Sequence, residues 1–349
     1  MSEFVFSLYA LPIGLVVTMF LTSLVMRVGV QRGVLDVPGE RSSHSSPVPR
    51  GGGVAVIITF YVFLFVYPRI VDVSIDLSVL VSLSLGGALV AAVGFFDDLK
   101  SIAAKWRFLT HLGAAVLSLI LLPSLPDIMI FGQSFDLGLF AYVFLAISLV
   151  WFVNLFNFMD GIDGIAGVET ITVLLSAALI LFVQGDVAWL TLFSFLAACV
   201  AGFLIWNWPP AKVFMGDACS GFLGFALGFF AIVTSLEGMI NLWTWLILCG
   251  VFVLDATTTL ITRIARGEKW YEAHRSHAYQ IMSRRVESHK TVTVGVMIIN
   301  LLWLLPLGYL SAIYPFWALL VCITALLPLL MLAVYVGAGT NRASNGALE

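Results

Sequence analysis

The chain of 349 residues is 61% hydrophobic and only 11% charged, with a mean hydropathy of +1.05. Soluble domains carry about a quarter charged residues, so this composition excludes a soluble protein and indicates a polytopic membrane protein. The net charge of −3 gives no sign of a nucleic-acid partner, and we expect none. The four cysteines show neither a metal-binding spacing nor a disulfide framework.

Apolar runs long enough to cross about 30 Å of hydrocarbon predict an all-α fold with about eleven transmembrane helices. The runs cover residues 4–26, 53–68, 79–96, 108–126, 139–156, 168–184, 188–206, 219–236, 240–262, 292–313 and 315–337. Because only Tyr314 and Pro315 separate the last two runs, ten helices are the alternative count. The first run lacks a basic leader and a cleavage site, so we expect a spanning helix rather than a signal peptide. We expect a single transmembrane domain over residues 1–349, with a frayed tail at 338–349.

The basic residues divide unequally between the two sides of these helices. All 17 Lys and Arg residues except Arg69 fall in loops on one side. Loops rich in Lys and Arg stay in the cytoplasm. The pattern therefore predicts an N-terminus outside, a C-terminus inside, and a cytoplasmic position for the polar motifs described next.

The most unusual stretch is Asn154-Leu-Phe-Asn157-Phe-Met-Asp160-Gly-Ile-Asp163-Gly-Ile-Ala-Gly167, which interrupts an apolar helix with amides, carboxylates and glycines. Glycines let another part of the backbone approach closely. Asp160 and Asp163 are three residues apart, so a helical turn would place both carboxylates on one face. Two acids held together in apolar surroundings attract a cation, and oxygen ligands favour Mg²⁺, with Mn²⁺ as the alternative. A glycine-rich loop with solvated acids is the other interpretation.

A second acidic site, Asp97-Asp98, ends another apolar helix. Neighbouring residues of a helix point about 100° apart, so we expect one acid to face the site and the other to face a supporting partner. Acids at a membrane boundary are the alternative explanation, although lysine is the more usual residue on a cytoplasmic edge.

A third acidic site follows Lys212 and Phe214, where Asp217 and Ser220 precede the next helix. Both residues are also candidates for the N-cap of that helix. A fourth acid, Asp255, lies inside an apolar run. An acid there costs about 3 kcal/mol, so we expect Asp255 to face the protein interior.

Two cytoplasmic loops carry groups that suit phosphate. The loop over residues 36–53 contains Arg41, His44 and Arg50 and ends in three glycines, whose amides beside arginines are typical of phosphate sites. An ordinary basic cytoplasmic loop with turn residues explains the same composition equally well.

The longest inner loop contains His274, Arg275 and His277, with the two histidines one helical turn apart. Two histidines without a third ligand make a weak transition-metal site, and an arginine beside them suits polyphosphate better. Carboxylates, basic loops and histidines therefore converge on one membrane face. The simplest ligand is a magnesium-bound pyrophosphate group, with a lipid handled by the apolar helices.

In this order the motifs resemble those of the polyprenyl-phosphate N-acetylhexosamine-1-phosphate transferase superfamily (glycosyltransferase family 4, MraY/WecA-like), over nearly the whole chain. The residues that carry the resemblance are Asp36, Pro38, Arg41, His44, Pro47 and Pro49; Asp97 and Asp98; Asn154, Asn157, Asp160, Gly161, Asp163 and Gly164; Phe214 to Asp217 with Ser220; and His274 and His277. Cys219 stands where the family usually has glycine. The histidine segment is less dense in histidine than that of MraY-like enzymes, so the chain is more similar to the O-antigen-initiating, WbpL-like branch.

The resemblance implies transfer of a sugar 1-phosphate of the N-acetylhexosamine type, with a 6-deoxy sugar as one option, from a UDP-sugar to undecaprenyl phosphate. It implies release of UMP, a need for Mg²⁺, and the first membrane step of O-antigen or related surface polysaccharide synthesis at a bacterial inner membrane. The alternatives are the peptidoglycan-precursor (phospho-MurNAc-pentapeptide) transferase of the same superfamily and, from another class, a nucleotide-sugar or lipid-linked-sugar transporter. The oligomeric state is open, with a homodimer as one option.

The resemblance also assigns roles to residues. Asp217 would hold Mg²⁺, Phe214 would stack on uracil, and Asp97 or Asp98 would prepare the lipid phosphate. The candidate catalytic residues are Asp97, Asp98, Asp160 and Asp163; the candidate metal ligands are Asp217, Asp97 and Asp98; the candidate substrate-binding residues are Asn154, Asn157, Phe214, Lys212, His274, Arg275, His277, Arg41 and His44.

Overall fold

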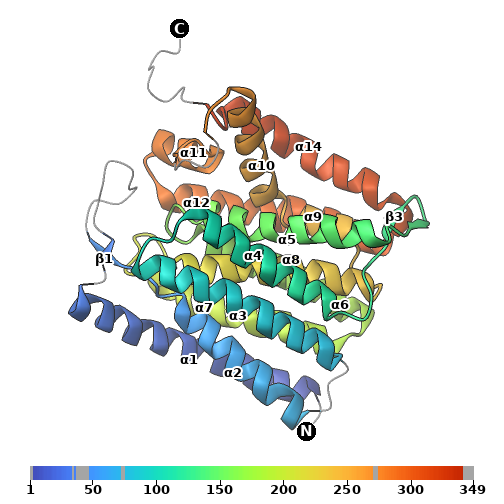
Figure 1. Ribbon diagram of the computed structural model, residues 1–349, viewed down its shortest axis with the longest axis horizontal. Coiled ribbons are helices and arrows are strands. Elements are labelled where there is room, and N and C mark those ends of the chain that lie inside the picture. The colour runs from blue at the N-terminus through green and yellow to red at the C-terminus, as the bar shows by residue number, and fades with distance from the viewer. Residues whose placement is uncertain (1–2, 34, 37–46, 72–74, 270–273, 341–349) are drawn as a thin grey trace.

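The computed structural model describes residues 3–33, 35–36, 47–71, 75–269 and 274–340. This part of the chain is a bundle of helices with two short β-hairpins at opposite ends (Figure 1). The first hairpin pairs β1 (Leu35–Asp36) with β2 (Val48–Pro49), and the second pairs β3 (Ile128–Ile130) with β4 (Gln133–Phe135), both antiparallel.

The helices follow the apolar runs of the sequence closely. In chain order they are α1 (Glu3–Arg32), α2 (Val54–Ile70), α3 (Leu77–Leu99), α4 (Ala104–Ile120), α5 (Leu139–Met159), α6 (Ile165–Gln184), α7 (Val187–Asn207), α8 (Asp217–Leu236), α9 (Leu242–Leu248), α10 (Gly250–Ala265), α11 (Ala278–Val286), α12 (His289–Ile299), η1 (Asn300–Leu304), α13 (Leu305–Ile313), η2 (Pro315–Trp317) and α14 (Ala318–Val336). Every predicted run overlaps a helix, so the all-α membrane fold is confirmed.

The number of membrane crossings stays a prediction. Within the described residues, eight helical segments are long and apolar enough to cross a bilayer, and a bent pair would make nine. Two other helices, α2 and α4, have 17 residues each and are shorter than these eight. The predicted eleven spans would require all of them to cross.

The predicted helix at 240–262 is wrong in one respect, because two helices occupy this run. The segments α9 and α10 meet at Cys249 with a bend of 83°. Apolar residues occur on both sides of the bend, so the hydropathy of the run carries no sign of it. The next helical span, His289–Ile313, is continuous, but its central segment η1 is a π-helix between the α-helices α12 and α13.

The helix α8 forms the centre of the bundle. In its most apolar window 89% of the residues are buried, and it packs between α3 and α5. Close approach is possible because glycines face the contacts. A Cβ on Gly224 would lie 2.4 Å from the carbonyl oxygen of Phe152 in α5. A Cβ on Gly94, near the end of α3, would lie 2.5 Å from the carbonyl oxygen of Asp217 and 2.6 Å from the nitrogen of Ala218.

We expect Gly94→Ala to lower the melting temperature of the purified protein by several degrees. The added methyl group meets backbone atoms of α8, which cannot rotate away, and overpacking of this kind costs about 1–3 kcal/mol. The matched control is Gly113→Ala in α4, where an added Cβ meets no atom within 4 Å. That variant should be neutral or slightly stabilising, since alanine favours a helix over glycine. Equal melting temperatures for the two variants would contradict the close contact of α3 with α8.

Candidate active site

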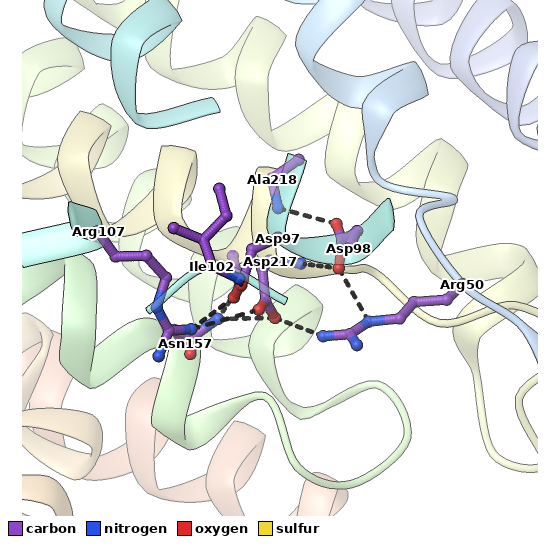
Figure 2. Close-up of polar contacts among 9 residues, drawn as sticks. Arg50, Asp97, Asp98, Ile102, Arg107, Asn157, Asp217 and Ala218 are labelled. Carbon is purple, nitrogen blue, oxygen red and sulfur yellow. Dashed lines mark hydrogen bonds and ion pairs between the residues drawn. The ribbon is translucent and has the colours of Figure 1, made fainter. Parts of the chain in front are cut away.

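A cluster of carboxylates and arginines lies where α3 ends and α8 begins (Figure 2). Asp97 and Asp98 belong to the last turn of α3, and Asp217 is the first residue of α8. Arg50 comes from the segment before α2, and Arg107 comes from the first turns of α4. The predicted meeting of the acidic sites near 97 and 217 is therefore present in the structure.

Asp98 holds the start of α8. Its Oδ1 accepts the backbone N–H of Asp217 at 2.9 Å, and its Oδ2 accepts that of Ala218 at 3.2 Å. The first amides of a helix have no intrahelical acceptor, and a negative charge is stabilised at this end. The sequence-based suggestion that Asp217 or Ser220 caps α8 is corrected: the N-cap position is Gly216, with φ +85°, and the capping carboxylate comes from α3.

Asp97 points to the other side of the α3 terminus. Its Oδ2 lies 2.5 Å from Arg107 Nη1, and its Oδ1 accepts the N–H of Ile102 at 2.6 Å. Arg107 Nη1 also lies 3.9 Å from Asp217 Oδ2, so one guanidinium contacts both carboxylates (Figure 2). The two neighbouring acids thus separate as expected: Asp97 faces Asp217, and Asp98 supports the backbone of α8.

Asp217 is the most accessible of the three acids, with 21% of its side chain exposed against 8% for Asp97 and 6% for Asp98. Its Oδ1 accepts Arg50 Nη2 at 2.6 Å and Asn157 Nδ2 at 3.0 Å. Asn157 also donates to Ser220 Oγ at 3.1 Å. Asp217 Oδ1 therefore takes the hydrogen bonds from both Arg50 and Asn157, while its Oδ2 lies 3.9 Å from Arg107 Nη1.

Arg50 bridges two of the acids, since its Nε lies 2.9 Å from Asp98 Oδ1 while its Nη2 contacts Asp217. Burial lowers the pKa of this guanidinium, but the charges of Asp217, Asp98 and Asp36 outweigh burial and leave the pKa raised. The backbone next to Arg50 is fixed by a hydrogen bond to the segment before α8, because the N–H of Phe214 donates to the carbonyl oxygen of Pro49 at 2.8 Å.

The glycines after Arg50 continue this pairing. The N–H groups of Gly52 and Gly53 donate to the carbonyls of Phe214 and Met215 at 2.9 and 3.0 Å. A side chain at Gly53 would place its Cβ 2.3 Å from that of Cys219. The amides of Gly52 and Gly53 are therefore used within the protein fold, whereas the guanidinium of Arg50 contacts two acids of the site.

The expected helical turn over Asp160 and Asp163 is not formed, which corrects the prediction that both carboxylates share one face. The helix α5 ends at Met159, and a turn precedes α6. Asp163 Oδ2 accepts the N–H of Ala211 at 3.0 Å and lies 3.3 Å from His289 Nδ1. Asp163 thus ties the turn to the segment before α8 and to α12.

Asp160 remains beside the cluster. Burial, and then the negative charge of Asp217, raise the pKa of Asp160 well above its usual value. Asn154, one of the predicted binding residues, donates to Val150 O of its own helix at 2.6 Å. Of the predicted amides, Asn157 is therefore the one that contacts the acid cluster.

The predicted histidine pair lies next to this turn. The residues 274–276 are not helical, yet the rings of His274 and His277 stack with centroids 4.9 Å apart. Asp255, buried as predicted, accepts the N–H groups of Ala278 and Tyr279 at 2.8 Å each. His277 Nδ1 lies 3.4 Å from Asp255 Oδ1.

Tyr279 joins the histidine segment to the turn after α5. Its hydroxyl donates to Phe158 O at 2.9 Å, and a Cβ on Gly161 would lie 2.1 Å from the same hydroxyl. Gly161 is therefore required for this contact. Sequence analysis did not single out Tyr279, although it follows directly after the histidine motif.

The other predicted binding residues lie at the edge of the site. Lys212 is exposed, with Nζ 5.5 Å from the Trp206 ring centroid, and Phe214 and Arg275 are half-buried. Arg41 and His44 lie outside the described residues.

The sequence analysis did not select Arg50 and Arg107 as site residues. Two sequence features could have indicated them: Arg50 directly precedes a run of glycines, and Arg107 lies in the basic segment that follows Asp97-Asp98.

The donor set fits a divalent cation with few protein ligands. Among the described residues, no group of three His, Cys, Asp or Glu side chains forms a ready metal cage. The facing carboxylates of Asp97 and Asp217 are nevertheless hard oxygen donors, and arginines now balance their charge. Mg²⁺ is commonly bound by one or two carboxylates together with substrate phosphates, which is the set available here.

Comparisons with known proteins agree with this geometry. The sequence model of the family described as "Glycosyl transferase family 4" matches residues 80–235, which include the acids at the end of α3, in the turn between α5 and α6, and at the start of α8. A probable undecaprenyl-phosphate N-acetylglucosaminyl 1-phosphate transferase of Bacillus subtilis (strain 168) is 26% identical over 298 residues, covering 84% of this chain and 82% of the relative.

Two further relatives are phospho-N-acetylmuramoyl-pentapeptide-transferases. That of Streptococcus thermophilus (strain ATCC BAA-250 / LMG 18311) is 30% identical over 212 residues, covering 60% of this chain and 61% of the relative. That of Streptococcus pneumoniae (strain Hungary19A-6) is 32% identical over 216 residues, covering 59% and 63%.

We expect Asp160→Asn to raise the melting temperature at pH 7.5 by roughly 2–4 °C, because the variant removes a partly buried carboxyl group whose ionisation is opposed by burial and by the charge of Asp217. The raised pKa means that the folded protein binds a proton more readily than the unfolded chain does. The parent should therefore gain stability as the pH falls through that pKa, and its difference from the variant should shrink. The matched control is Asp76→Asn, an exposed acid that accepts Ser78 N–H at 2.7 Å, which should give no such gain. A lower melting temperature for Asp160→Asn at pH 7.5 would argue against the repulsion.

Proposed function

The chain belongs to the MraY/WecA-like superfamily of sugar-1-phosphate transferases, which move a phosphosugar to undecaprenyl phosphate, and on this premise we propose its substrates and site. The proposed donor is a UDP-N-acetylhexosamine, and the proposed products are UMP and undecaprenyl-diphosphate-sugar. One observation carries the proposal: Asp97, Asp217, Arg50 and Arg107, from four separate segments, meet at one end of the bundle.

The proposed reaction is a direct displacement. An oxygen of the lipid phosphate attacks the β-phosphorus of the UDP-sugar, a new P–O bond forms, and the bond from the β-phosphorus to the bridging oxygen breaks. The bridging oxygen leaves with the α-phosphate as UMP. Two anions must approach each other in this step, so positive charges that remain fixed in place lower the barrier.

The arginines supply such fixed charges. Arg107 contacts Asp97 and lies 3.9 Å from Asp217 Oδ2, so it stands between the two acids. Arg50 stands on the other side of Asp217. We assign phosphate binding to both guanidiniums, which present paired N–H groups to anionic oxygens.

The acids divide into two proposed roles. Asp217 and Asp97 would hold Mg²⁺, which would neutralise charge on the transferring phosphoryl group. Asp98 would act as a positioning residue, because its oxygens already accept two amides and Arg50. Asp163 would likewise fix the turn after α5, so we propose a positioning role for it in place of the catalytic role expected from the sequence.

The remaining assignments follow the family motifs. Asn157 and Asp160 would order the metal shell and the donor phosphates. Phe214 would stack on uracil, and His274 and His277 would hold the diphosphate or the sugar. The position of Tyr279 beside Phe158 O supports this last role, because it keeps the histidine segment next to the Asp160 turn.

The pathway is also a proposal. We favour the first membrane step of O-antigen or related polysaccharide synthesis in a bacterial cytoplasmic membrane. One relative that covers 84% of this chain is a probable N-acetylglucosaminyl 1-phosphate transferase, and the histidine segment has fewer histidines than that of MraY-like enzymes. The second candidate is the peptidoglycan-precursor reaction, which the names of the streptococcal relatives favour.

The purified protein, mixed with undecaprenyl phosphate, Mg²⁺ and a panel of UDP-N-acetylhexosamines and UDP-MurNAc-pentapeptide, should release UMP with one class of donor. EDTA should stop the release, and added Mg²⁺ should restore it. Asp217→Asn should lower kcat by about 10²–10³ through loss of charge stabilisation, whereas Asp76→Asn at the other end of α3 should retain parental activity. Absence of UMP with every donor would refute the proposed function and favour a transporter.

Asp97→Asn should lower kcat without moving the acid limb of the pH–rate profile. The second pKa of a phosphate monoester is near 6, so the lipid phosphate is largely ionised at neutral pH and needs little help from a base. The measurement is kcat between pH 5 and 8.5 for the parent and the variant at saturating Mg²⁺. Loss of the acid limb in Asp97→Asn would instead identify Asp97 as a general base.

A further inference from the structure

A short segment after α14 lies against the elements that carry the histidines. The end of α14 is next to α10 and α11 (Figure 1). Residues 337–340 follow this helix end, and we call them the α14 strap. Within the strap Gly337, Ala338 and Gly339 are all buried. The proposed chemistry gives the strap no role, so its burial beside the site needs a separate explanation.

The strap turns the chain back from the end of α14. The helix ends at Val336, and Gly337 has φ +94°, a left-handed conformation that glycine commonly adopts at this position. The N–H groups of Gly337 and Ala338 both donate to Ala333 O, at 3.1 and 2.9 Å. The N–H of Thr340 donates back to Gly337 O at 3.0 Å. The shape of the turn is therefore fixed by its own backbone hydrogen bonds.

Gly339 is the residue at which the strap meets α10. It has φ +76°, and a Cβ here would lie 2.6 Å from Thr262 Cβ and 2.8 Å from the carbonyl oxygen of Thr259. Positions 255, 259 and 262 are spaced i, i+4 and i+7, so they share one face of α10. Thr259 Oγ1 also donates to Asp255 Oδ1 at 3.2 Å. The strap therefore docks on the face of α10 from which Asp255 holds the start of α11.

The strap also holds the histidine segment, residues 274–277, directly. The N–H of Gly339 donates to Ser276 O at 2.7 Å. Ser276 is buried, and residues 274–276 are not helical. A buried carbonyl outside a helix needs a donor from elsewhere, and Gly339 supplies one. Ser276 Oγ in turn lies 3.0 Å from His274 Nδ1. The hydrogen bond from Gly339 thus reaches the chain between the two histidines.

Arg285 of α11 contacts the other end of the strap. Its Nη2 donates to Val336 O, at the last residue of α14, at 3.0 Å. The histidine segment and α11 are therefore held at two points: Asp255 accepts the amides at the start of α11, and Gly339 donates to Ser276. Loss of the second point leaves the first in place, so the two contributions can be separated by experiment.

We propose that Gly339 is a positioning residue for the sugar nucleotide: through the carbonyl of Ser276 it fixes the histidine segment next to the turn after α5. This inference rests on the proposed function, in which His274 and His277 hold the diphosphate or the sugar of the donor. UMP lacks both the β-phosphate and the sugar. Loss of the strap contact should therefore weaken binding of the UDP-sugar more than binding of UMP.

The test variant is Gly339→Ala, whose added methyl group meets Thr262 and the backbone of Thr259 and so displaces the strap. The ligand is the UDP-sugar with which the parent releases UMP, measured by equilibrium dialysis with Mg²⁺ and without acceptor lipid. We expect its Kd to rise about fivefold to tenfold, as for the loss of one hydrogen bond. The Kd for UMP and the KM for undecaprenyl phosphate should stay within about twofold.

The matched control is Gly267→Ala. Gly267 follows the end of α10 and has φ +70°, but an added Cβ there meets no atom within 4 Å. The control therefore carries the same kind of backbone strain as Gly339→Ala without displacing the strap. It should keep the parental Kd for the UDP-sugar.

A second variant, Arg285→Met, serves if Gly339→Ala fails to fold. The side chain of Arg285 is exposed, and the change removes its hydrogen bond to Val336 O without adding bulk to the core. We expect the Kd for the UDP-sugar to rise in the same direction, by about twofold to fivefold, with the Kd for UMP unchanged.

Parental affinity for the UDP-sugar in folded Gly339→Ala would overturn the inference. So would a loss that is equal for the UDP-sugar and UMP, or equal in Gly339→Ala and Gly267→Ala, because general destabilisation or backbone strain then explains it. If Gly339→Ala does not fold, parental affinity in Arg285→Met overturns the inference in its place. The proposed function fails separately, since the parent itself would then release UMP from no donor.

Discussion

The structure depends on carboxylates that accept free amides at the start of a different helix. Asp98 of α3 does this for α8, and Asp255 of α10 does it for α11. A helix start leaves amides without acceptors, and hydrocarbon supplies no water to satisfy them. Each such carboxylate therefore joins two helices while it satisfies their polar groups. These carboxylate–amide hydrogen bonds place Asp217 near Asp97 and place His277 near the turn after α5, so they determine the geometry of the site.

Much of this arrangement could be predicted from local sequence patterns. Apolar runs predicted the helices because each must be long enough to cross the membrane, and this property is readable within one segment. The acids at 97, 98 and 217 could be selected because charged residues at the ends of such runs are costly. Their meeting in one cluster was expected from the bias of basic loops toward one side.

Other features could not be predicted because they depend on contacts between distant segments. The bend of 83° between α9 and α10 at Cys249 leaves the hydropathy of its own run unchanged. Arg50 resembled any basic loop residue until its pairing with Asp217 was seen. Asp163 has the spacing of a helical partner of Asp160, but Ala211 and His289 determine where it points. The residues that position the site were therefore harder to identify than the residues expected to perform chemistry.

The contact between Arg50 and Asp217 joins positions 167 residues apart, and this distance has a consequence for biosynthesis. While the ribosome is still making the middle of the chain, Arg50 lacks that carboxylate and Asp98 lacks the amides that it later accepts. Until α8 enters the membrane, the end of α3 that carries Asp97 and Asp98 therefore lies beside lipid headgroups or the insertion machinery. A chain truncated before α8 would thus keep the Arg50–Asp98 and Arg107–Asp97 ion pairs but would lack the third acid that joins them and the helix start that Asp98 caps.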